Sequence, residues 1–263
     1  MKIIQNTSFK SKSDLSKNNK KSKENIIYSE NSNKENYSGL RNDVLKVYFT
    51  GQVFNQTDKK AKFLADYINS LNQFKIADKS ELDGNYNHIG ATITDAILQA
   101  GLNYEKVVKP KVLHVLQKYP EAKNTSGFLK ILKEEGYPKV LIWKNQEKPE
   151  RMINLLNLLK SENVENEEEL KSWLKNSENT NKLKEIKGIG DKTVDYLKIL
   201  VGISTNAIDR HVFNFLNAAN IKVKDYNEAH QIISKTADLL AIDEAVFDYS
   251  IWKYMSTKNK NFS

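Results

Sequence analysis

Cysteine is absent from the 263-residue sequence. This absence excludes disulfide bonds, thiolate zinc sites and cysteine-ligated iron–sulfur clusters, and it fits a cytoplasmic setting. Long apolar runs are also lacking, since none approaches the roughly 20 residues that span a bilayer. The N-terminal stretch MKIIQNTSFKSKSDLS has no apolar core of the kind found in secretory signals. We therefore expect neither a membrane span nor a secretory signal.

Recognisable metal and nucleotide motifs are missing as well. The four histidines, His88, His114, His211 and His230, show no ligand spacing, so we predict no catalytic transition metal. The stretch GIGDKT lacks the spacing and the preceding strand of a phosphate-binding loop or a dinucleotide fingerprint. We therefore expect no metal or organic cofactor.

Positive charge is abundant. The formal net charge is +8 and the isoelectric point is about 9.2, values that favour a nucleic-acid partner. About half of this excess lies in residues 1–40, which hold eight Lys and four Asp or Glu. Residues 1–42 are dominated by Lys, Ser and Asn without periodicity, so we predict a disordered basic tail. Such a tail either makes weak phosphate contacts or is simply a solvated extension.

The remainder of the chain, 43–263, is predicted to be an all-α domain. Apolar residues recur at spacings of three and four, and four prolines interrupt the whole sequence. The only strand signals are two short runs, VYF at 47–49 and VLIW at 140–143. Thr125 or Ser126 is expected to cap one helix, and one of Ser204, Thr205 and Asn206 another. The helical patterns cover 57–74, 88–102, 106–120, 125–136, 149–163, 167–177, 192–202, 204–221 and 247–255.

A glycine-containing turn joins two of the helical patterns in LKEIKGIGDKTVDYL (183–197). Glycine permits positive φ and allows a phosphate to approach the backbone without a Cβ in the way. The N–H groups of the turn and of the next helix then form an anion site that does not read sequence. We predict a DNA-binding hairpin, with a purely structural turn as the alternative. The predicted DNA contacts are Lys187, Gly188, Ile189, Gly190 and Thr193.

An aspartate follows this hairpin in apolar surroundings. Asp209 lies between Ile208 and Val212 at the start of the 204–221 pattern. A carboxylate at a helix N-terminus is favoured by the helix dipole. Asp209 is therefore either a helix-terminal charge or a functional acid.

The two elements together resemble a known family. The pattern L-x-x-I-x-G-I-G-x-K-T (183–193), followed 17 residues after Lys192 by I-D-R-H-V (208–212), is similar to the helix-hairpin-helix-GPD superfamily of base-excision DNA glycosylases. That superfamily includes endonuclease III and the 8-oxoguanine glycosylases. The resemblance is firm over 183–213 and extends more weakly over 43–258. It implies two helical subdomains flanking a cleft, into which a damaged nucleotide is flipped from the duplex.

The resemblance also implies roles for individual residues. Lys192 stands where members with lyase activity carry the amine that attacks the sugar and forms a Schiff base. Asp209 would stabilise positive charge developing at the sugar. The helix FDYSIWKYM (247–255) could line the base pocket through Asp248 and Trp252, although Trp252 could equally be a buried helix aromatic.

The expected activity is therefore excision of a damaged, oxidised base followed by strand nicking through β-elimination. The missing cysteines separate the chain from the iron–sulfur members, and the hairpin permits a monovalent cation between turn carbonyls and phosphate. The expected partner is damaged double-stranded DNA, bound by a monomer in the cytoplasm, at the nucleoid if the protein is bacterial. The alternatives are a monofunctional glycosylase and a noncatalytic DNA-binding protein that uses Lys192 as a phosphate contact.

Overall fold

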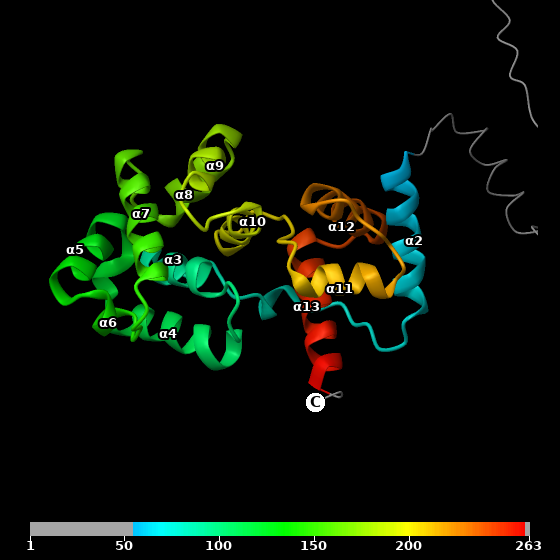
Figure 1. Ribbon diagram of the computed structural model, residues 1–263, viewed down its shortest axis with the longest axis horizontal. Coiled ribbons are helices and arrows are strands. Elements are labelled where there is room, and N and C mark those ends of the chain that lie inside the picture. Colours follow the sequence, from blue (N-terminus) through cyan, green and yellow to red (C-terminus); the bar gives the residue numbers. More distant parts are fainter. Residues whose placement is uncertain (1–54, 261–263) are drawn as a thin grey trace, which may run out of the picture. The chain divides into compact units, whose positions relative to one another are not determined.

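The computed structural model describes residues 55–260, with the side chains of the last three left out (Figure 1). These residues belong to the second of two units into which the chain divides, Val53–Ser263. The predicted tail at 1–42, the start of the predicted domain and the VYF run at 47–49 lie outside the described residues.

Residues 55–260 contain helices and no strand, so the prediction of an all-α fold is confirmed. One π-helix, Tyr104–Val108, directly precedes α4, and single 3₁₀ turns occur at Lys79–Glu81 and Pro120–Lys123. None of the described helices combines the length and the apolar character needed to cross a membrane. The α-helices are α2 (Gln56–Ser70), α3 (Ile89–Leu98), α4 (Lys109–Lys118), α5 (Thr125–Glu135), α6 (Tyr137–Val140), α7 (Glu147–Ser161), α8 (Glu167–Leu174), α9 (Ser177–Lys184), α10 (Asp191–Leu200), α11 (Arg210–Ala218), α12 (Tyr226–Leu240) and α13 (Glu244–Lys260).

The helices from α3 to α10 share one hydrophobic core. The apolar stripe of α3 contributes Ile89, Ile93 and Ile97, and every residue of this helix is buried. α3 packs against α4, α5, α7 and α10, so it lies at the centre of this group. A helix that is buried on all sides is expected to be mainly apolar, and the polar exceptions in α3 are Thr92, Thr94 and Asp95.

A second core is built from α2, α11, α12 and α13. Leu64 and Ile68 of α2 join Phe215 of α11, Ile232 of α12 and Phe247 of α13 in this cluster. α2 packs against α12 although the two helices are far apart in sequence (Figure 1). The apolar spacing of the pattern at 57–74 is thereby confirmed in α2, because Ala61, Leu64, Ala65 and Ile68 are its buried residues.

The strand signal of VLIW at 140–143 is misleading, because no strand forms there. Val140 ends the short helix α6, where Pro138 occupies one of the first positions, a place at which the missing N–H of proline costs nothing. Leu141 N–H donates to Tyr137 O at 2.9 Å and both Val140 and Leu141 are buried. Ile142 then takes a positive φ of 49°, which ends the helix and rules out an extended run.

Two predicted helix caps are also wrong. Asn124, and not Thr125 or Ser126, caps α5 by accepting a hydrogen bond from Gly127 N–H. α11 begins six residues later than its pattern, and Asp209 caps it in place of Ser204, Thr205 or Asn206. In both cases the side-chain oxygen lies within reach of an N–H two or three residues ahead, which is the geometry of an N-cap.

Candidate active site

The hairpin at 183–197 contains the end of α9, a turn and most of α10. Gly188 in the turn has a φ of +89°, a value that strains any residue with a Cβ. Gly190 is extended and is the N-cap residue of α10, where no side chain caps the helix. Ile189 is buried between them. The first N–H groups of α10 therefore have no side-chain partner at the point where the turn meets the helix.

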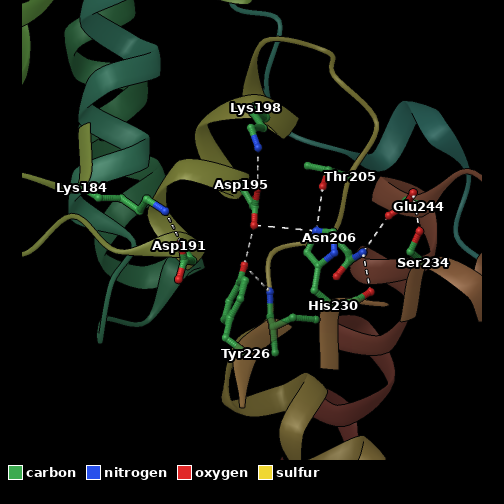
Figure 2. A network of polar contacts seen from close by, with 11 residues as sticks. Lys184, Asp191, Asp195, Lys198, Thr205, Asn206, Tyr226, His230, Ser234 and Glu244 are labelled. Carbon is green, nitrogen blue, oxygen red and sulfur yellow. Dashed lines mark hydrogen bonds and ion pairs between the residues drawn. The ribbon is translucent and has the colours of Figure 1, made fainter. Parts of the chain in front are cut away.

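One ion pair across the hairpin and one contact from Arg151 to the backbone hold this turn. Arg151 of α7 donates from Nε to Lys187 O at 2.9 Å and pairs with Glu147 at 3.0 Å. Its guanidinium occupies the space that a Cβ on Gly188 would fill. Lys184 of α9 pairs with Asp191 of α10 at 3.1 Å across the hairpin (Figure 2).

The five predicted DNA contacts differ in exposure. Lys187, Gly188 and Gly190 are exposed, whereas Ile189 and Thr193 are buried. Ile189 belongs to the first core, and Thr193 N–H donates to Gly190 O at 3.0 Å. The side chains of Ile189 and Thr193 are therefore buried in the interior. The other three residues form the exposed surface of the turn.

Lys192 lies in the first turn of α10 and is half-buried. Its Nζ donates to Gln99 Oε1 and lies 5.9 Å from the centre of the Tyr196 ring. Burial lowers the pKa of Lys192, while the carboxylates of Asp209 and Asp248 act in the opposite direction. Loss of hydration disfavours the ammonium form, so the site favours a neutral amine more than water does.

Asp209 is the N-cap residue of α11. Its Oδ1 accepts hydrogen bonds from His211 N–H at 2.7 Å and from Val212 N–H at 3.1 Å, and Oδ2 takes part in neither. These two bonds fix the orientation of the carboxylate. Asp209 can cap the helix and also take part in chemistry, because Oδ1 accepts both capping hydrogen bonds and Oδ2 accepts neither.

Asp248 and Trp252 lie one turn apart on α13. Burial raises the pKa of Asp248 well above its ordinary value, and the neighbouring charge of Asp209 raises it further. Asp248 Oδ1 is buried and has no hydrogen-bond partner within the described residues. Trp252 stacks on Tyr249 with ring centres 5.5 Å apart and meets the edge of His211 at 6.5 Å.

A pocket of about 840 Å³ brings together four of the predicted site residues, Lys192, Asp209, Asp248 and Trp252. Its wall comes from the end of α3 and the loop after it, from α10, from the start of α11 and from α13. The volume lies in the range of pockets that take one small organic ligand. The pocket lining includes neither the hairpin turn nor the other two tryptophans of the sequence, Trp143 and Trp173.

Sequence reasoning missed a buried carboxylate beneath this pocket. Asp95 of α3 is fully buried and accepts hydrogen bonds from the hydroxyls of Tyr86 (2.7 Å), Tyr104 (2.9 Å) and Tyr196 (3.1 Å). Burial raises the pKa of Asp95 to about 6, and the three hydroxyls oppose that rise. Tyr104 and Tyr196 both line the pocket. The one signal in the sequence for this buried carboxylate was an acidic residue inside the apolar helical pattern at 88–102.

A polar network links α10 to α12 (Figure 2). Asp195, which is buried, accepts a hydrogen bond from Tyr226 Oη at 2.8 Å and pairs with Lys198 at 2.9 Å. His230 Nε2 lies 3.8 Å from the same carboxylate and 3.1 Å from Thr205 Oγ1. Tyr226 Oη also accepts from Ile208 N–H at 3.3 Å, next to Asp209. This network therefore ties the loop that carries Asp209 to both helices.

The histidines do not gather at one place. His88 caps α3, His211 lines the pocket and His230 belongs to the network of Asp195. Within residues 55–260, no group of three or more His, Asp or Glu side chains is arranged to hold a metal ion.

Comparison with known proteins yields a family and no characterised relative. A family model described as "Domain of unknown function (DUF8548)" matches residues 62–256, and the chain belongs to this family. The search of curated proteins and the search of solved structures find no match.

Proposed function

We propose that this member of the DUF8548 family is a base-excision DNA glycosylase of the helix-hairpin-helix-GPD type, with β-lyase activity. The observation that carries the proposal is the shared pocket of Lys192 and Asp209. An amine with a lowered pKa and a carboxylate both line this pocket, and they are 17 positions apart in the sequence, as in the glycosylase motif. The proposal includes the oxidised base as substrate and damaged duplex DNA as partner.

The lysine supplies the nucleophile in this proposal. Its neutral amine forms a bond to the sugar C1′ while the bond from C1′ to the base breaks, and the base leaves with a proton from solvent. Opening of the sugar ring gives a Schiff base. Loss of a proton from C2′ then expels the 3′ phosphate, and water releases the sugar from Lys192. Burial promotes the first step, because only the unprotonated amine has a free electron pair.

The two carboxylates have separate tasks. Asp209, oriented by its two backbone hydrogen bonds, would stabilise the positive charge that develops at the sugar. Asp248, whose raised pKa favours the neutral acid, would contact the flipped base together with the face of Trp252. Two carboxyl groups in different environments can thus serve as charged and neutral partners in one pocket.

The exposed part of the hairpin would hold the DNA backbone. Gly190 has no neighbouring atom within 4 Å of the position of a Cβ, so the approach to the start of α10 is open. Lys187 lies exposed beside it. Contacts of this kind grip phosphate irrespective of sequence, as a repair enzyme that scans DNA requires.

Borohydride trapping tests the proposed function. The protein is incubated with duplexes that contain an abasic site, 8-oxoguanine, an oxidised pyrimidine, uracil or an alkylated purine, and then reduced. We expect a covalent adduct with the wild type and none with Lys192→Ala, while DNA affinity changes less than about threefold. Lys175→Ala, which removes an exposed lysine outside the pocket, is the matched control.

A second variant separates chemistry from helix capping. Asp209→Asn keeps a side-chain acceptor that caps helices well but removes the charge. We expect it to fold normally and to lose base release by 100-fold or more. An adduct absent from every duplex would refute the lyase, and base release without an adduct would identify a monofunctional glycosylase. DNA binding alone would favour the noncatalytic alternative.

A further inference from the structure

The amine of Lys192 has one direct hydrogen-bond partner among the described residues, the side chain of Gln99. Gln99 is the C-cap residue of α3 and is half-buried at the edge of the pocket. Its Oε1 accepts from Lys192 Nζ, and its Nε2 donates to Ala96 O at 3.5 Å. The amide is therefore engaged at both ends, with its oxygen toward the amine.

The turn that carries Gln99 is itself anchored. Gln99 N–H donates to Asp95 O at 3.1 Å. Lys148 of α7 donates from Nζ to the two carbonyls on either side, Leu98 O at 2.7 Å and Ala100 O at 2.6 Å. A lysine at this place also complements the negative end of the helix dipole. Gln99 thus projects from a helix end that cannot move freely.

We propose that Gln99 is a positioning residue that aims the Lys192 amine at the reacting carbon. This inference rests on the proposed function. A lysine amine sits on a flexible four-carbon stem, and attack requires the electron pair to be directed within a narrow range of angles. When the neutral amine donates one N–H to Gln99 Oε1, its orientation is fixed and its electron pair is free to point elsewhere in the pocket.

The titration of Lys192 reports on this contact. A carbonyl oxygen binds an ammonium more strongly than an amine, so Gln99 raises the pKa of Lys192 slightly within a site where burial lowers it. Other charged and titratable groups act on Lys192 in the same region, and these residues are the same in every variant. They are Asp95, Lys148, Asp209, Arg210, His211 and Asp248.

Two substitutions at Gln99 should move the pH profile of trapping in opposite directions. Gln99→Leu removes the acceptor, and we expect the midpoint to fall by half a unit or more while the rate on the alkaline plateau drops at least tenfold. Gln99→Glu keeps an acceptor and adds a charge, and we expect the midpoint to rise by a unit or more with a plateau within about threefold of the wild type. Gln117→Leu, on the exposed side of α4, is the matched control.

Nitrogen-15 NMR of the lysine amines in the DNA-free protein gives a second readout that needs no catalysis. We expect the titration midpoint of Lys192 to shift down in Gln99→Leu and up in Gln99→Glu. Unchanged midpoints in both experiments, or an equal loss of plateau rate in both variants, would overturn the inference. If the wild type forms no adduct, the proposed function fails, and the NMR titration still decides whether Gln99 controls the state of Lys192.

Discussion

At the scale of single residues, the pocket contains ionisable groups whose pKa values are shifted from the ordinary ones by burial. Burial lowers the pKa of Lys192 and raises that of Asp248. Both shifts favour the uncharged form, as expected where hydration is lost. Such perturbed groups gather at functional sites more often than elsewhere, which is consistent with the proposed chemistry.

Asp95 offers a residue-scale prediction on stability. Its pKa is about 6 in the folded protein, above the ordinary value of 3.8. As the pH rises from about 4, the unfolded chain ionises first and the folded protein retains the proton, so the free energy of unfolding falls. The loss is complete above about pH 6 and amounts to about 3 kcal/mol.

Replacing Asp95 with asparagine removes the carboxyl group that titrates. We expect the stability difference between the wild type and Asp95→Asn to fall by about 3 kcal/mol between pH 3.5 and pH 7. Urea unfolding at a series of pH values measures it. A difference that stays constant over this range would show that Asp95 ionises normally in its buried site.

At the scale of elements, the hairpin contains two glycines with different tasks. Gly188 has a positive φ and lies under the guanidinium of Arg151, whereas Gly190 has an extended backbone with open space around it. Gly188 is therefore required by the conformation of the turn. A side chain at position 190 would fit in the free protein and would clash only with a ligand bound beside it.

Alanine at each position separates these tasks. We expect Gly188→Ala to lower the free energy of unfolding by about 1–2 kcal/mol and Gly190→Ala to change it by less than about 0.5 kcal/mol. In a fluorescence anisotropy titration with duplex DNA, Gly190→Ala should nevertheless weaken binding about tenfold at low salt. Full affinity in Gly190→Ala would show that phosphate does not approach this glycine.

At the scale of the whole described region, the two hydrophobic cores are joined by polar contacts around Asp195. α10 belongs to the first core and α12 to the second, and Tyr226 bonds across them to Asp195 and to the loop before Asp209. Buried hydrogen bonds to a carboxylate contribute more than neutral ones. The network thus holds Asp209 near Lys192.

Removing one hydroxyl tests this link. We expect Tyr226→Phe to lower the free energy of unfolding by about 1–3 kcal/mol and to speed amide hydrogen exchange in the segment 203–209. Base release should slow as well, because Asp209 loses a support. Wild-type exchange rates in that segment would show that the link does not restrain it. Tyr67→Phe, on α2 in the second core, is a suitable control, since its ring packs against Phe215 and can stay in place.

The sequence by itself predicted most of the helices and the two motif residues, but none of its predicted patterns covered α12 (Tyr226–Leu240). Apolar spacing of three and four produced the buried stripe of α2, and helix caps act within two or three residues. The strand signal at 140–143 was misleading because a short apolar run does not by itself distinguish a strand from the end of a buried helix.

Tertiary structure alone decided which residues meet at the pocket. Gln99 and Lys192 are 93 positions apart, Asp95 and Tyr196 are 101 apart, and Arg151 reaches Lys187 across 36. No local periodicity encodes such pairs, because they depend on how α3, α7 and α10 pack into one core. Lys192 and Asp209 were chosen through the resemblance of their motifs to the glycosylase family. The side chains that bury them, orient them and shift their pKa values come from helices distant in the sequence, so only the packed structure identifies those side chains.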